Sequence, residues 1–143
     1  MKNYEFEKVI PIEDQVKILY KLLKKRKFKI SHKTIPSYEN HKKFVYSNPY
    51  RKWFLIKFDE SYLGNFYLTY QNIIGINLIN YDDNAQLLSI LKFIIEKYKP
   101  LKEIPSIRNS NFLINTSPSN LELNKKLKKM GYQVIQNTYL ILK

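Results

Sequence analysis

Glycine places the strongest constraint on this chain, because it occurs only three times, at Gly64, Gly75 and Gly131. Loops that wrap around phosphates need several glycines within a few residues, since a backbone without Cβ atoms approaches a phosphate closely. The three glycines are too far apart to form such a loop. The sequence therefore excludes a P-loop and a glycine-rich dinucleotide fingerprint. Each glycine instead marks one structural position, two inside apolar runs and one after a helical stretch.

Length and composition predict one folded domain over residues 1–143, because 44% of the residues are hydrophobic and the chain is long enough to bury a core. The absence of cysteine excludes disulfides, thiol catalysis and cysteine-based zinc sites. Only two histidines are present, so few nitrogen ligands remain for a metal. We expect no metal cofactor.

The formal net charge of +13 comes from 25 lysines and arginines against 12 acidic residues. Such a charge attracts nucleic acid, yet lysine clusters such as residues 24–27 and 125–129 more often form solvated helix faces. Electrostatic binding of nucleic acid is therefore a further hypothesis and not the favoured one. No apolar run approaches the roughly 20 residues of a membrane span, and the first residues lack the apolar core of a signal peptide. A cytoplasmic protein without a membrane span is expected.

Four helices are predicted from apolar periodicity and from the residues that cap helices. They cover residues 12–25, a stretch that starts after Pro36, residues 82–98 and residues 119–131. Ser37 is the expected N-cap of the second helix. Ser119 and Glu122 are expected to form a capping box for the fourth helix, with Gly131 as its C-cap.

Six strands are predicted from short apolar or alternating runs bounded by turn residues. They cover residues 9–12, 53–58, 62–70, 73–79, 112–115 and 132–142. The three central strands are expected to be antiparallel, because short turns join them. With the helices, the predicted order is β-α-α-β-β-β-α-β-α-β, which is an α+β domain.

Three parts of the chain carry a family resemblance. Residues 53–56 and 62–68 (WFLI and YLGNFYL) are similar to a strand pair with a recurrent glycine, and residues 74–78 (IGINL) are similar to a central strand. Residues 115–120 and 128–132 (NTSPSN and KKMGY) are similar to a late strand–helix motif that ends in Gly-aromatic. Together they resemble the GCN5-related N-acetyltransferase (GNAT) superfamily. The resemblance implies a mixed, mostly antiparallel central sheet flanked by helices.

The resemblance also implies an activity, namely acetyl transfer from acetyl-coenzyme A to a small amine such as an amino sugar. A backbone amide near Asn77 and Leu78 is then expected to polarise the thioester carbonyl. The helix that includes Asn84 is expected to receive the coenzyme diphosphate at its N-terminus. Asn120 matches a position that often contacts the pantetheine arm.

The acid–base and acceptor residues are less well defined by the sequence. His32 and Tyr139 are the catalytic candidates, since an imidazole or a phenol can transfer a proton. Tyr67, Tyr70 and Arg108 are candidates for contacting the acceptor, because a phenol ring can stack on a sugar and a guanidinium can bind an anion. For each of them, a packed or solvated side chain is the competing interpretation.

The sequence departs from the family pattern where the chemistry is most demanding. Residues 80–86 (NYDDNAQ) hold two aspartates and no glycine where the family usually has a glycine-containing phosphate loop. The aspartates predict a helix cap whose carboxylates occupy amides that a phosphate needs. Leu127 stands where a tyrosine often acts as general acid, and residues 62–81 contain no carboxylate. The alternative hypothesis is therefore a catalytically degenerate GNAT domain that binds a ligand or a protein.

Overall fold

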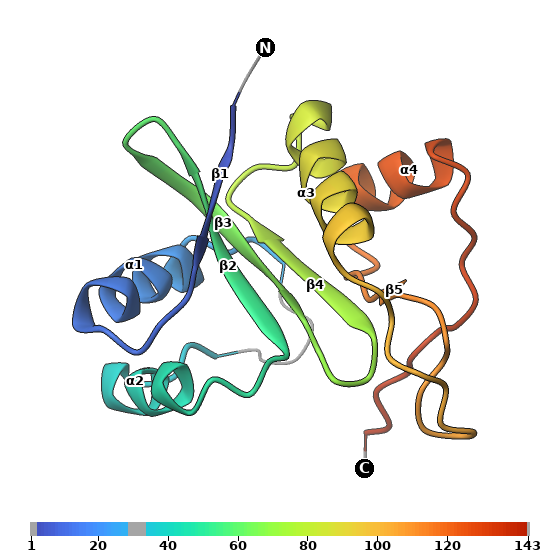
Figure 1. The fold of residues 1–143 in the computed structure, drawn as a ribbon, viewed down its shortest axis with the longest axis horizontal. Coiled ribbons are helices and arrows are strands. Elements are labelled where there is room, and N and C mark those ends of the chain that lie inside the picture. Colours follow the sequence, from blue (N-terminus) through green and yellow to red (C-terminus); the bar gives the residue numbers. More distant parts are fainter. Residues whose placement is uncertain (1–2, 29–33, 143) are drawn as a thin grey trace.

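The computed structural model describes residues 3–28 and 34–142 and shows one mixed sheet with helices on both faces (Figure 1). The strands are β1 (Glu5–Lys8), β2 (Lys52–Phe58), β3 (Ser61–Leu68), β4 (Ile73–Leu78) and β5 (Leu113–Ile114). The helices are α1 (Glu13–Lys24), α2 (Tyr38–Ser47), α3 (Asn84–Lys97) and α4 (Leu121–Lys129). The sheet order is β1-β2-β3-β4-β5, antiparallel except for the parallel pair of β4 and β5. The predicted α+β class with a mostly antiparallel sheet is confirmed.

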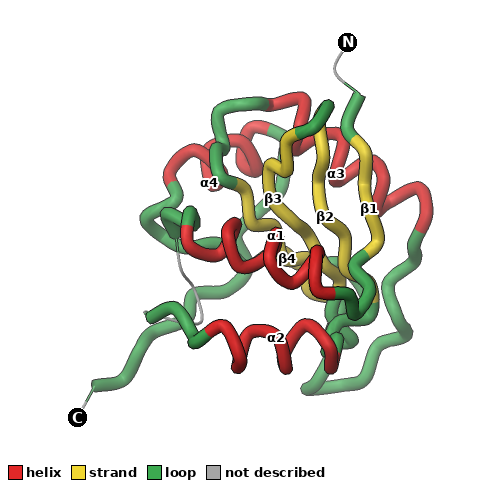
Figure 2. The backbone as a smooth tube through the Cα atoms, turned by 90° about the vertical axis from the view of Figure 1, so that its left-hand side faces the viewer, coloured by secondary structure: helices red, strands yellow, loops and turns green. Residues whose placement is uncertain are grey.

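The sheet is buried on both faces, which explains why β2 reads as an almost continuous apolar run. Trp53 and Leu55 point toward α1 and α2 and join Val16, Leu19 and Val45 in one core. The alternate residues of β2 point the other way, into a second core beneath α3 and α4. Figure 2 shows α1 and α2 in front of the strands and α3 and α4 behind them.

The first and last predicted strands are wrong. β1 lies at Glu5–Lys8, upstream of the predicted 9–12, and pairs with β2 as an edge strand. The charged residues Glu5 and Glu7 interrupt the apolar alternation by which a strand is recognised in a sequence. Pro11 lacks the backbone N–H that a strand extended through this position needs. Residues 132–142 form no strand. The alternation of apolar residues in this segment is typical of a strand. However, β5 has only two residues, and β4 is the only strand that pairs with it in the part of the chain that the structure describes.

The fourth helix begins one residue later than predicted. Asn120 is its N-cap, and the Asn120 Oδ1 accepts a hydrogen bond from the Leu123 N–H at 3.2 Å. The Ser119 hydroxyl instead pairs with the Ser117 hydroxyl at 2.8 Å, so the predicted capping box with Glu122 is wrong. At the other end, the Gly131 N–H donates to Lys128 O and the Tyr132 N–H donates to Leu127 O. This is a Schellman pattern in which Met130 is the C-cap and Gly131, with a φ of 91°, is the left-handed residue that follows it, one position after the predicted C-cap.

Asn72, in the turn between β3 and β4, holds the β5 side of the sheet in place. Asn72 is fully buried, and its side-chain amide nitrogen donates to Leu101 O at 2.9 Å and to Asn109 O at 2.7 Å. Its Oδ1 accepts from the Leu101 N–H at 2.7 Å, and its carbonyl accepts from the Leu113 N–H at 2.9 Å. One buried side chain therefore fixes the 100–111 loop and the start of β5 against β4.

Two glycines of the central strands are required by close approach. A Cβ at Gly64 would lie 2.2 Å from the carbonyl oxygen of Asn77, and one at Gly75 would lie 2.0 Å from the Tyr67 ring. Gly64 also borders a shift of register between β2 and β3, as a bulge requires. The Tyr67 ring lies over Gly75 and stacks on Tyr50, with ring centroids 3.8 Å apart.

The contact between Tyr67 and Gly75 gives a testable coupling. Gly75→Ala should lower the free energy of unfolding by about 1–3 kcal/mol, because the new methyl group overpacks the Tyr67 ring. In a Tyr67→Ala background the same substitution should lower it by much less. Urea denaturation of the four chains of the double-mutant cycle measures the difference. Equal losses in both backgrounds would contradict this account of Gly75.

His41 gives the fold a dependence on pH. It is buried between α2 and α1, with its ring centroid 5.1 Å from that of Tyr20, and burial lowers its pKa below 6.5. The unfolded chain therefore binds the proton more readily, so the free energy of unfolding should fall as the pH drops below about 6.5. Urea denaturation at about pH 7.5 and about pH 5.5 measures the loss. His41→Gln should be less stable at both values but lose less between them, and an unchanged loss would contradict the assignment.

Candidate functional site

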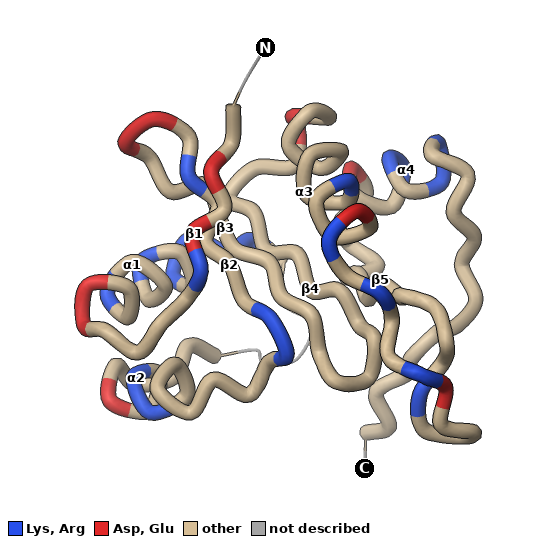
Figure 3. The backbone as a smooth tube through the Cα atoms, viewed as in Figure 1, with Lys and Arg blue, Asp and Glu red and all other residues tan. Residues whose placement is uncertain are grey.

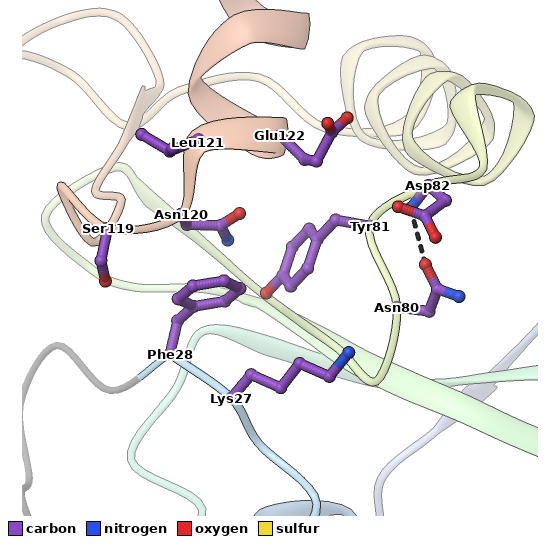
Figure 4. A pocket seen from close by; sticks show the side chains of 9 residues that line it. All are labelled: Lys27, Phe28, Asn80, Tyr81, Asp82, Ser119, Asn120, Leu121 and Glu122. Carbon is purple, nitrogen blue, oxygen red and sulfur yellow. Dashed lines mark hydrogen bonds between the residues drawn. The ribbon is translucent and has the colours of Figure 1, made fainter.

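The candidate site lies where β4 continues beyond its short pairing with β5. The two strands pair only at Ile73 with Leu113 and at Ile74 with Ile114, whereas β4 runs on to Leu78. A pocket of about 350 Å³ lies at this end of β4, beside the start of α4. Its lining residues are Lys27, Phe28, Asn80, Tyr81, Asp82, Ser119, Asn120, Leu121 and Glu122 (Figure 4). The pocket is thus built from the loops before α3 and α4 and from the segment after α1.

Tyr81 closes the inner end of this pocket. Its hydroxyl accepts a hydrogen bond from the Leu78 N–H and donates one to the Ile76 carbonyl, both at 3.2 Å. Its ring packs edge-on against Phe28, with centroids 5.9 Å apart. Burial raises the pKa of Tyr81 above 10.0, against the opposing effect of the Leu78 amide. The phenol is therefore neutral near pH 7, and it already uses the Leu78 amide that the resemblance assigns to a thioester carbonyl.

Asn120 lies on the opposite wall of the pocket and is almost completely buried. Its Oδ1 caps α4 through the Leu123 N–H, and its backbone N–H donates to Ser117 O at 3.0 Å. From the second turn of α4, the ammonium group of Lys126 donates to the carbonyl of Tyr81. These contacts join α4 to the segment that precedes α3 across the pocket.

The N-terminus of α3 is capped by the chain itself. Asp83 is the N-cap, and its Oδ1 accepts from the Ala85 N–H at 2.9 Å. Its other carboxylate oxygen accepts from the hydroxyl of Tyr4, whose pKa is raised to about 12 by burial and by Asp83. The Asp82 N–H donates to Asn80 Oδ1 at 2.7 Å. The prediction that carboxylates occupy amides at this helix start is confirmed for Ala85.

The predicted cofactor residues gather at one end of β4. Asn77 and Leu78 are its last two residues, Asn84 is the first residue of α3, and Asn120 faces the pocket from α4. Asn77 pairs with Asn65 of β3, whose side chain accepts from the Trp53 indole N–H at 3.1 Å. Of these four residues only Asn120 is among those that line the pocket, and the roles that the resemblance gives them toward a cofactor stay predictions.

The predicted acceptor residues do not form one group. Tyr67 is the second-to-last residue of β3 and packs on Gly75 and Tyr50. Tyr70 is exposed in the turn at the far end of β4 from the pocket. Arg108 lies near it, and its guanidinium donates to Lys102 O at 2.7 Å and to Tyr70 O at 3.1 Å. Arg108 therefore links two loops through backbone carbonyls.

Of the two catalytic candidates, only Tyr139 is among the residues that the structure describes, and it does not line the pocket. His32 lies outside the described residues, and Tyr139 is 78% exposed in the 132–142 segment. Leu127, at the position of the family's tyrosine, packs against the core beneath α3. Within residues 3–28 and 34–142, no group of three or more histidine, aspartate or glutamate side chains is arranged to hold a metal.

Phe28 and Lys126 were not identified from the sequence as part of this site. Their contacts with Tyr81 span 53 and 45 positions along the chain. Loop conformations decide which such residues meet, and no local pattern encodes that. For Tyr81 itself, the sequence offered only that it is one of twelve tyrosines, any of which could supply a phenol.

The basic residues do not concentrate on the pocket. Figure 3 shows lysine and arginine positions spread over several elements, including α1, α3 and α4. The buried polar residues among those described include no lysine or arginine. This distribution agrees with the expectation that the lysine clusters form solvated helix faces. No described helix is both long enough and apolar enough to cross a membrane.

Comparisons with known proteins bear on the fold. No family model and no curated protein sequence matches the chain. Its structure resembles that of AAC(6')-Iy in complex with the bisubstrate analogue CoA-S-monomethyl-acetylneamine, with a TM-score of 0.60 and 10% identity over 99% of this chain and 98% of that one. It also resembles a possible acetyltransferase from Clostridium difficile 630, with a TM-score of 0.56 and 13% identity over 98% and 97% of the two chains. The chain therefore has the fold of the GCN5-related N-acetyltransferases.

Proposed function

We propose that this protein is an acyltransferase that takes acetyl-coenzyme A as donor and acetylates the amine of a small molecule, an amino sugar being the expected acceptor. The observation that carries the proposal is the pocket between the end of β4 and the start of α4. The analogue bound to the structurally similar AAC(6')-Iy combines coenzyme A with acetylneamine, which supports this donor and this class of acceptor. We expect the protein to act in the cytoplasm.

The pocket suits the pantetheine arm of the donor better than its diphosphate. An amide-rich arm needs polar partners within a narrow apolar space, and Asn120, Tyr81 and Phe28 supply both kinds of surface. At the diphosphate end, Asp82 lines the pocket and Asp83 already holds the Ala85 N–H. Two carboxylates beside a helix start repel an anion that the helix would otherwise attract. The residues therefore fit the arm, and they weaken binding of the phosphates.

The donor supplies an acyl group already activated as a thioester, so the protein's own task is positioning. Leu78 can offer its N–H to an incoming carbonyl only when the Tyr81 hydroxyl gives up that hydrogen bond. The neutral amine of the acceptor then has to meet the donor without a carboxylate base on the central strands, because residues 62–81 contain none. Rate enhancement would come from orientation and from one oriented backbone donor.

A second candidate function is a catalytically degenerate domain that binds a ligand or a protein through the same pocket. The observation that favours it is that two of the amides needed for acetyl-coenzyme A, those of Leu78 and Ala85, are already hydrogen-bonded within the chain. Leu127 in place of a tyrosine also removes the usual proton donor for the leaving thiolate. Binding and turnover of acetyl-coenzyme A separate the two functions.

Removing the Tyr81 hydroxyl should strengthen donor binding. In Tyr81→Phe the Leu78 N–H loses its partner, so a thioester carbonyl gains a free donor and acetyl-coenzyme A should bind about 2–10-fold tighter. Tyr98→Phe is the matched control, since Tyr98 packs against Phe54 and Phe93 away from the pocket. Titration calorimetry measures all three chains. Absence of heat at millimolar donor for the native chain and for Tyr81→Phe would reject acetyl-coenzyme A as the ligand.

Removing the charge of Asp82 or Asp83 should strengthen binding of the donor's phosphates. Asp82→Asn and Asp83→Asn keep side chains that can cap a helix, and each should bind acetyl-coenzyme A about 2–5-fold tighter at low salt. Neither should change the affinity for acetyl-pantetheine, which has no phosphate. Asp59→Asn, in the exposed turn between β2 and β3, is the control for overall charge. An equal gain with acetyl-pantetheine would contradict repulsion of the phosphates.

A further inference from the structure

Only three of the 25 basic residues are arginines, and one of them has surroundings unlike those of the other two. Arg51 and Arg108 donate from their guanidinium groups to backbone carbonyls at 2.7–3.1 Å. Arg26, two residues after α1, makes no hydrogen bond or ion pair from its guanidinium with any group in residues 3–28 and 34–142. Its Nε is nevertheless buried. Arg26 therefore holds a buried donor for which the described chain supplies no acceptor.

The guanidinium of Arg26 can also be reached from outside. Arg26 as a whole is only half-buried, and of its three side-chain nitrogens only Nε is buried without a partner. A guanidinium carries five N–H donors in a planar fork that matches a carboxylate or a phosphate. An unpaired buried donor destabilises a folded chain. An anion that binds Arg26 therefore gains its hydrogen bonds without displacing an internal partner.

Two tyrosines locate the charge of Arg26 near β4. Burial raises the pKa of Tyr50 and of Tyr81, and the positive charge of Arg26 is among the effects that oppose this rise at both residues. Tyr50 stacks on Tyr67, whose ring covers Gly75 of β4. The Tyr81 hydroxyl bonds to the backbone of the same strand further along. The guanidinium is therefore close to both tyrosines that contact or border the central strand.

The surroundings of Arg26 suit an anion. Tyr50 and Tyr81 stay neutral near pH 7 because their pKa is raised, so neither compensates the positive charge. The nearby carboxylates of Asp82 and Glu122 line the pocket, and neither forms an ion pair with Arg26. Partly buried surroundings strengthen a charge-assisted hydrogen bond. An unpaired cation beside neutral phenols therefore fits a negatively charged group of a ligand.

The face of the sheet indicates which ligand carries that group. Tyr50 belongs to the core between the sheet and the helices α1 and α2. Helix α3, whose start is expected to receive the donor's diphosphate, covers the opposite face. A cation that acts on Tyr50 is therefore better placed for the acceptor than for the donor's phosphates.

We propose that Arg26 determines specificity by binding an anionic group, a phosphate or a carboxylate, on the amine that the protein acetylates. This inference rests on the proposed function, in which the amine meets the donor beside Leu78. An acceptor with an amine alone would bring a second positive charge toward an unpaired guanidinium, which is unfavourable. An amino sugar with an acidic group satisfies the guanidinium and leaves its amine free to react.

Acceptors that share an amino sugar and differ in an acidic group test the proposal. With acetyl-coenzyme A as donor, glucosamine 6-phosphate or muramic acid should be acetylated with a kcat/KM about 10–100-fold above that of glucosamine. The better of the two identifies the group as phosphate or carboxylate. Arg26→Gln should lose this preference, and Lys25→Gln, at the exposed neighbouring position, should keep it. Glucosamine used as well as both acidic sugars, or an unchanged preference in Arg26→Gln, would overturn the proposal.

A binding measurement without donor separates failure of this inference from failure of the proposed function. Because the chain has three arginines, the Arg26 Nε–H can be assigned in a ¹⁵N-correlated NMR spectrum as the signal that Arg26→Gln lacks. Glucosamine 6-phosphate or muramic acid should shift this signal, and glucosamine should not. A shift without acetyl transfer would support anion binding by Arg26 and reject the acyltransferase. Acetyl transfer without a shift would overturn the role of Arg26.

Two further measurements on Arg26→Gln exclude other roles. Titration calorimetry should show that it binds acetyl-coenzyme A as tightly as the native chain does, and a loss confined to acetyl-coenzyme A and absent with acetyl-pantetheine would assign Arg26 to the donor's phosphates. Urea denaturation should give a free energy of unfolding equal to or above the native value, because an unpaired buried donor is removed. A large loss of stability would show a structural role. Either of these contrary results would overturn the proposal.

Discussion

The candidate site depends on the hydrogen bonds that the buried side chain of Asn72 makes. Its amide and carbonyl groups bind the 100–111 loop at Leu101 and Asn109, and its backbone carbonyl binds the start of β5. A buried amide left without these partners would be strongly unfavourable, so the arrangement is fixed once the turn closes. β5 is thereby held beside β4 at one end only. The other end of β4 is left for the pocket.

The groups that stabilise the pocket include two backbone amides, those of Leu78 and Ala85, that the proposed function assigns to the donor. Tyr81 satisfies the Leu78 N–H, Asp83 satisfies the Ala85 N–H, and Asn120 satisfies the Leu123 N–H. Polar groups near a core rarely stay unpaired, and these three amides are each satisfied within the chain. Under the proposed function, the donor therefore has to replace the hydrogen bond between Tyr81 and Leu78, and its apparent affinity would be reduced in proportion to the fraction of molecules in which Tyr81 keeps that bond.

The sequence correctly predicted those elements whose signals lie within a few neighbouring residues. Examples are the periodic apolar residues of α1, the Ser37 cap of α2, and the strands β2–β4, which short turns join. The strand predicted at residues 132–142 is wrong because apolar alternation indicates that a segment can form a strand but does not supply a neighbouring strand. β5, the last strand of the sheet, has only two residues and offers little backbone to pair with. For the site, the sequence singled out the end of β4 at Asn77 and Leu78, and it singled out Asn120, which lines the pocket. Their roles toward a cofactor stay predictions. Phe28 and Lys126 reach it through loops, which periodicity does not describe.

Helix α4 connects one wall of the pocket to the rest of the domain through few contacts. That helix is short, buries only Leu123 completely, and contacts the segment before α3 through Lys126 and Tyr81. Its first residues line the pocket, while its last residues lead into residues 132–142 through Gly131. The position of the Asn120 wall therefore depends on the burial of Leu123 and on the contact between Lys126 and the Tyr81 carbonyl, which join α4 to the segment that carries Tyr81.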